Sequence, residues 1–466
     1  MSGPAQPQHS AHAASGKLPL GVKIGYGIGD IGGNLYFTMI GTFLLFYFTD
    51  VLDINPALAG WAFAIGKIWD AVSDPAMGYI SDHAKTRWGR RRPFILLGGV
   101  LLLGTMVLMF FDPGFEHELS LFVYVSVAFV LVNTAYTITN VPYSAIVPEL
   151  TSDYDERTVI NGFRNVFAVV GTFTAFVLVP VVVDAFGGGD YAWTMMALVM
   201  GGVMFLSALI TFVTVPEPDI TLAPSQDNVI KQYVDVLKMK EYLTVLFPWT
   251  LHIAGITFLQ ASLIYYFNNI YRQPGLLETA LATLLFSALV FIPLWVMIAK
   301  RIGKKLTYNI GMSVFATAVI LFFFLGEPLG PVYAYVTMAI AGIGLATQYV
   351  MPYSLVADVV ELDFANTGAR REGVFFGLFT LVSKAGQGLA GLVSGLVLAA
   401  GNYVSPPEGV DFIPQAESAV FAIKLLTGPI PAVCFIIGVV VLSFYPITAQ
   451  AYAEIRRRVE AREENV

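Results

Sequence analysis

The chain alternates between long apolar segments and short polar stretches. An α-helix needs about 20 consecutive apolar residues to cross the hydrocarbon core of a bilayer. Segments of that length recur at 22–50, 56–81, 93–112, 119–147, 159–184, 190–215, 241–270, 276–299, 306–326, 331–357, 372–400 and 418–446. The pattern predicts an all-α membrane protein with twelve transmembrane helices.

The second of these segments carries three charged residues, Lys67, Asp70 and Asp74. Their i, i+3, i+7 spacing places them on one face of a helix. A charge near the bilayer centre costs roughly 2.5–3.5 kcal/mol on insertion scales. Asp70 and Asp74, one turn apart, repel each other unless a positive charge lies between them. The pattern indicates a cation site; the alternative is a structural ion cluster that satisfies itself.

Composition excludes a soluble protein. Hydrophobic residues make up 56% of the chain and charged residues 13%, whereas soluble domains carry about 25% charged residues. The single cysteine, Cys434, excludes an intramolecular disulfide and argues against redox chemistry. The first 21 residues have no apolar core typical of a signal peptide, and we expect a disordered cytoplasmic tail.

Lys and Arg are concentrated in alternate loops, which orients a membrane protein with those loops in the cytoplasm. The basic loop residues are Lys85, Arg87, Arg90, Arg91, Arg92, Arg157, Lys231, Lys238, Lys240, Lys300, Arg301, Lys304, Lys305, Arg370 and Arg371. Acidic residues dominate the intervening loops, with Arg272 as the main basic exception. We expect both termini in the cytoplasm, which requires an even number of spans.

The chain repeats itself six segments apart. Residues 140–149 (NVPYSAIVPE) are echoed by residues 350–358 (VMPYSLVAD), and residues 88–92 (WGRRR) are weakly echoed by residues 301–305 (RIGKK). The repeat predicts two parallel six-helix halves with a binding site between them near the midplane. The expected divisions are a tail at 1–21, halves at 22–216 and 241–446, a cytoplasmic linker at 217–240 and a tail at 447–466.

Several motifs occur in a fixed order along nearly the whole chain. They are residues 26–30 (YGIGD), 48–50 (FTD), 68–75 (IWDAVSDP), 78–82 (GYISD), 86–91 (TRWGRR), 140–143 (NVPY), 357–358 (AD) and 371–373 (REG). Residues 78–91 resemble the loop signature of the major facilitator superfamily. Together the motifs resemble the glycoside–pentoside–hexuronide:cation symporters, the family of melibiose permease.

The resemblance implies a secondary active transporter, in which Na⁺ or H⁺ drives symport of a sugar, glycoside or uronide by alternating access. Animal lysolipid symporters share the Trp-Asp and Asp-Pro stretch of residues 69–75, so a lysolipid or another amphiphilic or anionic solute is an alternative substrate. A transporter-like sensor or scaffold is a second alternative. The sequence has neither a phosphate-binding loop nor a His/Cys ligand cluster, so we expect no enzyme and no cofactor beyond the coupling ion.

The resemblance assigns the cation site to four residues. Asp70 and Asp74 match the family's cation-binding acids and would be the metal ligands if the ion is Na⁺. Thr137 matches a hydroxyl ligand beside them. Ser73 stands where melibiose permease has an Asn that tunes cation choice, which leaves Na⁺ and H⁺ both open.

The substrate side departs from that pattern. Asn34 and Asn140 replace the acids that bond sugar hydroxyls, and Ser144 replaces a Trp that stacks on the sugar. Asp30 lies one turn before Asn34 and is expected to face the same cavity. Asn34 and Asn140 have alternative roles in helix packing and in satisfying backbone groups near Pro142. The loss of both acids motivates the hypothesis of an anionic or zwitterionic substrate.

Four further residues complete the expected substrate site. Arg164 and Lys384 match family positions near both sites, or act as counter-ions to Asp70 and Asp74. Tyr26 is an expected cavity aromatic and Gln348 an expected polar contact. Beyond the site, His252 is either a proton relay or, as we favour, a packing residue.

Charged residues at the cytoplasmic ends of the helices are expected to lock the halves in the outward-facing state, through charge pairs that break on switching. They are Asp82, Arg90 and Arg91 in the first half and Asp358 and Arg371, with Glu361, in the second. The expected partners are a small-molecule substrate, the coupling cation and the lipid bilayer, without nucleic acid. We expect a monomer that spans the bacterial inner membrane several times.

Overall fold

The computed structural model describes residues 17–151, 154–217, 229–273, 275–369, 371–407, 410 and 412–463. All regular secondary structure in these residues is helical. The α-helices are α1 (Leu20–Phe46), α2 (Pro56–His83), α3 (Arg92–Met109), α4 (Glu118–Leu150), α5 (Tyr154–Ala185), α6 (Asp190–Thr214), α7 (Val229–Leu237), α8 (Lys240–Tyr266), α9 (Leu276–Ile302), α10 (Lys304–Leu329), α11 (Pro331–Leu345), α12 (Met351–Thr367), α13 (Glu372–Ala400), α14 (Glu417–Thr427), α15 (Pro429–Leu442) and α16 (Ala449–Glu463).

Eleven segments of the described chain are long and apolar enough to cross a membrane. The helix α2 is missing from that set although it has 28 residues and is about 42 Å long. Its charged residues, Lys67, Asp70, Asp74 and Asp82, lower its hydropathy. Counted with α2, the spans agree with the predicted twelve-helix multi-pass fold, in which each helix satisfies its own backbone hydrogen bonds.

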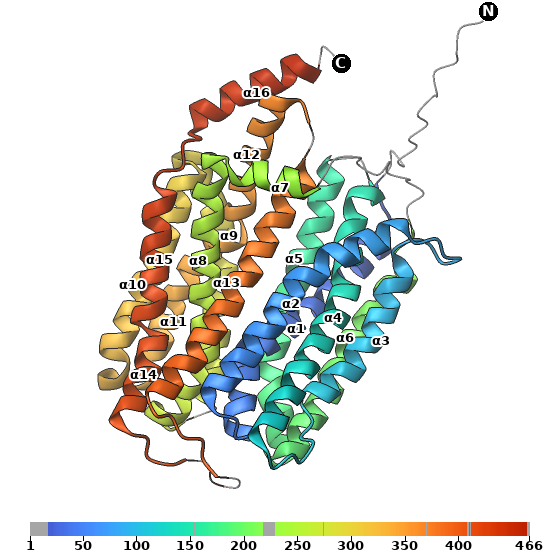
Figure 1. The fold of residues 1–466 in the computed structure, drawn as a ribbon. Coiled ribbons are helices and arrows are strands. Elements are labelled where there is room, and N and C mark those ends of the chain that lie inside the picture. Colours follow the sequence, from blue (N-terminus) through green and yellow to red (C-terminus); the bar gives the residue numbers. More distant parts are fainter. Residues whose placement is uncertain are drawn as a thin grey trace, which may run out of the picture.

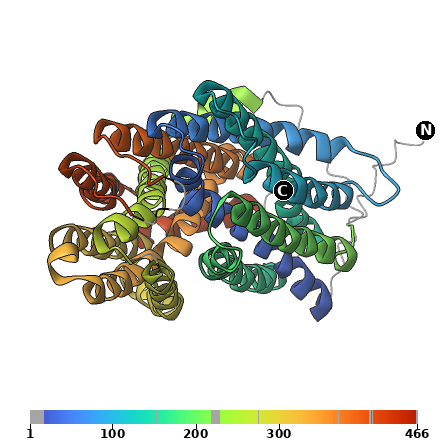
Figure 2. The ribbon, with the colours of Figure 1, turned by 90° about the horizontal axis from the view of Figure 1, so that it is seen from below.

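The spanning helices form two groups that stand side by side (Figures 1 and 2). One group holds α1–α6 and the other α8–α15. Two spans of the second group are interrupted: a 3₁₀ turn, Ala346–Tyr349, separates α11 from α12, and Gly428 separates α14 from α15. The short helices α7 and α16 lie outside the bundle, at the end where both termini emerge.

The predicted linker and tails contain more helix than their polar sequences suggested. The linker at 217–240 includes α7, and the C-terminal tail at 447–466 includes α16. In the N-terminal tail, α1 already begins at Leu20, and residues 1–16 lie outside the described residues.

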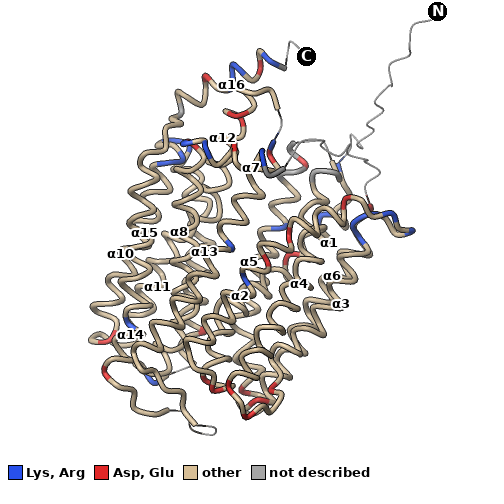
Figure 3. The backbone as a smooth tube through the Cα atoms, viewed as in Figure 1, with Lys and Arg blue, Asp and Glu red and all other residues tan. Residues whose placement is uncertain are grey.

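Charge separates the two ends of the molecule (Figure 3). Lys and Arg gather at the end that carries α7 and α16, where Asp and Glu accompany them, whereas the charged residues of the opposite end are mostly Asp and Glu. The positive-inside rule identifies the end with the termini as the cytoplasmic end. The opposite end is called the outer end below.

The backbone supports the predicted internal repeat. Gly89 and Gly303 occupy equivalent places in the WGRRR and RIGKK loops, and both have positive φ angles, 105° and 85°. A positive φ is strained for residues with a Cβ, which favours glycine at both positions, although residues 84–91 join α2 to α3 and Gly303 alone joins α9 to α10.

Glycines bring the two groups of helices into close contact at the outer end. A Cβ on Gly395 of α13 would lie 2.2 Å from the carbonyl oxygen of Pro56, the first residue of α2. A Cβ on Gly60 would lie 2.8 Å from the carbonyl oxygen of Leu392. Small residues allow membrane helices to approach this closely. Helices α2 and α13 therefore pack tightly between their outer ends and the mid-depth site described next.

Candidate functional site

The charged face predicted on α2 lies in the interior of the molecule. Asp70 is 1% exposed and Lys67 3%, whereas the carboxyl of Asp74 keeps 22% of its surface. The helix α2 runs without interruption through these three residues. The side chain of Asn55 caps its N-terminus, and Pro75 lies inside the helix, directly after Asp74. A buried carboxylate pair of this kind needs a positive partner.

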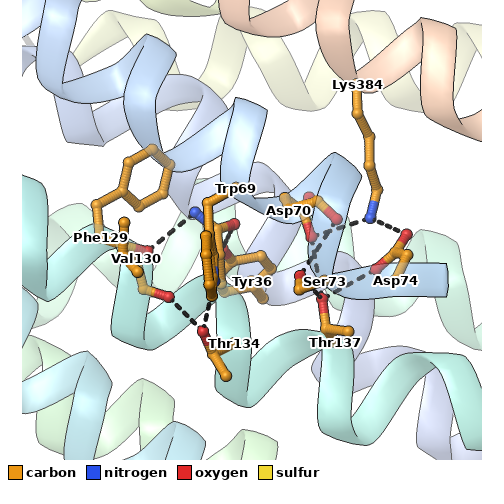
Figure 4. A network of polar contacts seen from close by, with 11 residues as sticks. Tyr36, Trp69, Asp70, Ser73, Asp74, Phe129, Val130, Thr134, Thr137 and Lys384 are labelled. Atoms are coloured by element: carbon orange, nitrogen blue, oxygen red, sulfur yellow. Dashed lines mark hydrogen bonds and ion pairs between the residues drawn. The ribbon is translucent and has the colours of Figure 1, made fainter. Parts of the chain in front are cut away.

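That partner is Lys384, which comes from α13 in the other group of helices (Figure 4). Its Nζ lies 3.0 Å from Asp70 Oδ1 and 2.5 Å from Asp74 Oδ2. The ammonium therefore stands between the two acids, where the sequence indicated a positive charge. It also joins the two groups of helices at mid-depth in the bundle.

Two hydroxyls complete the cluster from the remaining sides. Thr137 Oγ1 on α4 lies 3.1 Å from Asp70 Oδ1 and 2.9 Å from Asp74 Oδ1. Ser73 Oγ lies 3.2 Å from Thr137 Oγ1 and donates to the backbone oxygen of Asp70. All four residues predicted for the cation site are thus brought together.

One oxygen of the cluster has no partner: Asp70 Oδ2 is buried and accepts no hydrogen bond. A buried acceptor left unsatisfied is costly, which makes this oxygen a ready ligand for a cation. Carboxylate and hydroxyl oxygens are hard ligands suited to Na⁺ or a proton. Among the described residues no group of three His, Cys, Asp or Glu side chains could hold a metal ion. Beside the two carboxylates, the cluster offers the hydroxyl oxygens of Thr137 and Ser73.

Neighbouring aromatic and amide groups fix the position of the cluster. Tyr36 donates to Asn133 Oδ1 at 2.7 Å, and Asn133 is itself bonded to the backbone of α4. Tyr36 stacks on Tyr136 with ring centroids 4.3 Å apart, and Lys384 Nζ lies 6.0 Å from the Tyr136 ring. The Lys67 ammonium lies 5.5 Å from the Phe37 ring and is close enough to Asp70, Asp74 and Lys384 for their charges to act on it.

A second ion pair lies nearby, between α1 and α5. Arg164 Nε donates to Asp30 Oδ2 at 2.7 Å, and the guanidinium stands over the Tyr143 ring at 5.5 Å. Tyr143 and Tyr26 stack 4.5 Å apart and donate to each other's backbone oxygens. Tyr26 is fully buried, so its part here is to hold Tyr143 rather than to line a cavity.

The two clusters share one polar surface around Gly33. Asp30 Oδ1, Asn140 Oδ1 and the Tyr136 hydroxyl all lie within 4.0 Å of the position that a Cβ on Gly33 would take. Tyr136 is also close enough to Asp70 and Asp74 for their charges to act on it. The absence of a side chain at Gly33 keeps this surface open.

The other predicted substrate residues are placed as follows. Asn34 donates to the backbone oxygen of Asp30, so its amide N–H serves its own helix while its oxygen remains available. Ser144 is half-buried, one turn after Asn140 on α4. Gln348 is 5% exposed in the 3₁₀ turn, and neither polar atom of its amide has a partner.

The cytoplasmic charged residues pair within their own halves. Arg91 donates to Asp82 at 2.8 Å and to the backbone oxygen of Ala145. The backbone N–H groups of Arg90 and Arg91 donate to Glu217 Oε1, which caps the start of α3.

In the second half, Lys304 lies 2.6 Å from Asp358, and Arg371 donates to Asp363 through two nitrogens. The hydrogen bonds to Asp363 raise the pKa of Arg371. Sequence reasoning missed both partners. The internal repeat could have pointed to Lys304 as a charged residue of interest, because Lys304 follows Gly303 as Arg90 follows Gly89.

Sequence reasoning also missed a set of hydrogen bonds between the halves at the outer end. The Tyr403 hydroxyl donates to Asp50 Oδ1 at 2.5 Å, and Thr49 Oγ1 lies 2.6 Å from the Tyr265 hydroxyl. Burial raises the pKa of Tyr403, which keeps its hydroxyl protonated as a donor. On the first-half side, the FTD motif at residues 48–50 was the sequence feature that could have pointed to these hydrogen bonds.

His252 is placed as the packing interpretation expects. It is fully buried in α8, with Nδ1 2.7 Å from the Tyr308 hydroxyl, and a Cβ on Gly438 would lie 2.3 Å from its Nε2. These neighbours enclose the ring within the second half, away from the ion pairs.

Comparison with known proteins extends this picture. A family model described as MFS/sugar transport protein matches residues 25–449. The chain is 28% identical to the isoprimeverose transporter of Lactiplantibacillus pentosus over 92% of the chain and 89% of that protein. It is 28% identical to the glucuronide carrier protein homolog of Escherichia coli over 94% of the chain and 95% of that protein. It is 27% identical to the sphingosine-1-phosphate transporter MFSD2B of Xenopus tropicalis over 95% of the chain and 91% of that protein.

Solved structures share the fold. The nucleoside transporter NupG superposes with a TM-score of 0.64 at 14% identity, over 91% of this chain and all of that one.

Proposed function

Because the chain belongs to the MFS/sugar transport protein family, we propose that it carries a sugar, glycoside or uronide across the membrane together with Na⁺ or H⁺, by alternating access. It is a multi-pass carrier of the inner membrane and not an enzyme. The observation that carries the coupling is the Lys384 ammonium between Asp70 and Asp74, with Asp70 Oδ2 left unpartnered.

The coupling follows from competition for the two carboxylates. Without a bound cation, the single Lys384 ammonium balances one of the two carboxylate charges of Asp70 and Asp74, and the remaining negative charge attracts a cation. A Na⁺ ion or a proton at these acids weakens their attraction for Lys384 and releases its ammonium toward the polar surface around Gly33. Substrate that binds this surface then favours the cation-loaded state, and the cation favours substrate binding by the same factor.

The halves meet on the side away from the cytoplasm, which supports an inward-facing state. Hydrogen bonds of Thr49 with Tyr265, Asp50 with Tyr403 and Asp53 with Ser405 link the halves at the outer end. The glycine contact of α2 with α13 lies between these bonds and Lys384. Release of a solute toward the cytoplasm is compatible with this arrangement.

Asp30 and Arg164 supply the charges for binding an ionic group. Arg164 is a bidentate donor that suits a carboxylate, and the glucuronide carrier homolog is one of the relatives. We therefore favour an anionic glycoside or uronide over a neutral sugar. The alternative is an amphiphilic anion, supported by the likeness to MFSD2B.

Uptake into proteoliposomes tests the proposal. The probes are methyl β-D-glucoside, methyl β-D-xyloside and methyl β-D-glucuronide, each with an inward Na⁺ gradient, an inward proton gradient or neither. Accumulation that requires one gradient is the expected result, and flux that ignores both gradients excludes symport. Sphingosine-1-phosphate and lysophosphatidylcholine, offered in the same vesicles, test the amphiphile alternative; no flux of any probe favours a sensor or scaffold.

A further inference from the structure

Four aromatic side chains from the second half form a cluster opposite Arg164. They are Trp249 on α8, Tyr353 on α12, and Phe376 and Phe379 on α13. Trp249 stacks on Phe379 with centroids 4.9 Å apart and planes at 11°. Tyr353 lies 5.7 Å from Trp249, 5.6 Å from Phe379 and 6.3 Å from Phe376, with its ring nearly parallel to that of Phe376.

Tyr353 is the exposed member of this cluster. It keeps 51% of its surface, whereas Trp249 keeps 7% and Phe379 1%. The hydroxyl of Tyr353 is close enough to Arg164 and Asp30 for both charges to act on it. Because those two residues lie on the inner face of the first half, the exposed surface of Tyr353 faces the space between the halves rather than lipid.

The buried aromatic rings hold Tyr353 in place. Trp249 and Phe379 pack edge-on against it, and the indole N–H of Trp249 has no acceptor. In the first half, by contrast, Tyr26, Tyr36 and Tyr143 are buried, and Tyr136 is half-buried with its ring stacked on Tyr36 and its hydroxyl at the surface around Gly33. The aromatic surface and the ionic surface therefore come from opposite walls of one space.

These positions define the shape of a suitable ligand. An aromatic face is electron-rich and attracts weakly positive C–H groups. One face of a pyranose ring consists of such C–H groups, while its edge carries hydroxyls or a carboxylate. A pyranoside between the walls can place its C–H face on Tyr353 and its polar edge at Arg164 and Asn140. The Tyr353 hydroxyl is available to bond a ring substituent.

We infer that Tyr353, supported by Trp249 and Phe379, is the stacking platform that selects a ring-shaped glycoside as the substrate. The inference rests on the proposed transport function and narrows it to pyranosides. A flexible acyl chain has no need of a flat aromatic partner, so the platform distinguishes a glycoside carrier from an amphiphile carrier with the same ion pairs.

Isothermal titration of the purified full-length protein in nanodiscs tests the inference. The probes are the methyl and 4-nitrophenyl β-D-glycosides of glucose, xylose and glucuronic acid, with saturating Na⁺ and at acidic pH. Tyr353→Leu keeps an apolar side chain and removes the aromatic face. We expect it to weaken binding of the pyranoside that the native protein binds most tightly by about five- to tenfold, the effect of one good aromatic contact.

Matched variants separate stacking from other effects. Tyr353→Phe keeps the ring and should bind within about twofold of the native protein if its hydroxyl contributes little. Tyr335→Leu changes a tyrosine of α11 that bonds Thr279 within the second half, and it should leave binding unchanged. Cation affinity without sugar should be the same in Tyr353→Leu as in the native protein, which also shows that the variant is folded. If Tyr353→Leu does not fold, Tyr353→Gln is measured in its place.

The outcomes distinguish the two levels of the argument. Native protein that binds none of the pyranosides overturns the proposed function, and the platform with it. Native protein that binds a pyranoside, with Tyr353→Leu and Tyr353→Gln retaining its affinity, overturns the platform alone. Loss in Tyr353→Leu that Tyr353→Phe reproduces assigns the effect to the hydroxyl and also overturns stacking.

Discussion

Lys384 and Asp74 lie 310 residues apart in the chain, and their side chains meet at 2.5 Å across the boundary between the two halves. The same ammonium reaches Asp70 at 3.0 Å. This contact makes the charge state of α2 depend on the position of α13. Ion binding and the relative position of the halves are thus coupled through one side chain.

Replacing Lys384 by methionine leaves two carboxylates without their counter-ion. Loss of one partner of a buried ion pair costs about 3–5 kcal/mol, and we expect Lys384→Met to lower the thermal unfolding midpoint accordingly. Added Na⁺ or acidic pH should restore much of the loss, because either one neutralises the acids. Lys424→Met is the control, since its partner Glu327 is half exposed and surface pairs contribute about 1 kcal/mol or less. Equal midpoints with and without Na⁺ or acid would count against a cation site.

Asp70→Asn should uncouple substrate from cation. The substitution removes the charge that attracts the ion and weakens the acceptor of Lys384. We expect substrate affinity, measured by titration, to lose its dependence on Na⁺ and pH. Asp74→Asn should reduce the dependence of substrate affinity on Na⁺ and pH less than Asp70→Asn does, because the Asp74 carboxyl is more exposed. Asp112→Asn, in an outer loop, is the control, and full coupling in Asp70→Asn would refute the assignment.

Asp30→Asn should change substrate preference in favour of anions. The substitution removes the carboxylate 2.7 Å from Arg164 and leaves the guanidinium free for a substrate carboxylate. We expect the affinity ratio of methyl β-D-glucuronide to methyl β-D-glucoside to rise about tenfold, the effect of one charge-assisted hydrogen bond. Asp112→Asn, in an outer loop, keeps Asp30 and should leave the ratio close to native. A fall in the ratio would show that Asp30 does not compete with the substrate.

Tyr403→Phe should loosen the outer end. It removes the donor to Asp50, a hydrogen bond to a charged group worth about 1.5–3 kcal/mol. We expect the population of outward-open molecules to rise, seen as longer distances between spin labels. The labels are attached at Glu116→Cys and Ala416→Cys in a Cys434→Ser background. Tyr271→Phe, whose hydroxyl bonds Gly326 within the second half, is the control. An unchanged distance distribution would show that this bond does not hold the outer end closed.

Asp82→Ala should move the same equilibrium from the cytoplasmic side without abolishing binding. Its partner Arg91 is 5% exposed and would lose its carboxylate. In this structure the pair lies within the first half, so its proposed role in the outward-facing state requires a change of partners. The same spin labels report the shift, and Asp235→Ala on α7 is the control. Complete loss of substrate binding in a folded Asp82→Ala protein would argue against a gate role.

The fold followed from sequence because its determinants are local. The apolar runs, the alternation of basic loops and the charged face of α2 each depend on residues close together in the chain. Asp70, Asp74, Thr137 and Ser73 were accessible for the same reason, aided by family motifs. The structure brings these four side chains together.

Pairings between distant segments were not accessible in this way. Asp50 with Tyr403, Lys304 with Asp358 and Arg371 with Asp363 depend on how far each helix rotates and slides against its neighbours. Tyr26 is a second example. Its position in the sequence predicts which face of the helix it lies on, but not whether that face meets a cavity or another helix. Tyr143 covers it.

Glycine, rather than charge, dominates the contact of α2 with α13 toward the outer end. Gly60 and Gly395 meet backbone atoms directly, so little of this contact is open to screening by ions. The outer face should therefore open and close at a similar rate in dilute and in saline surroundings.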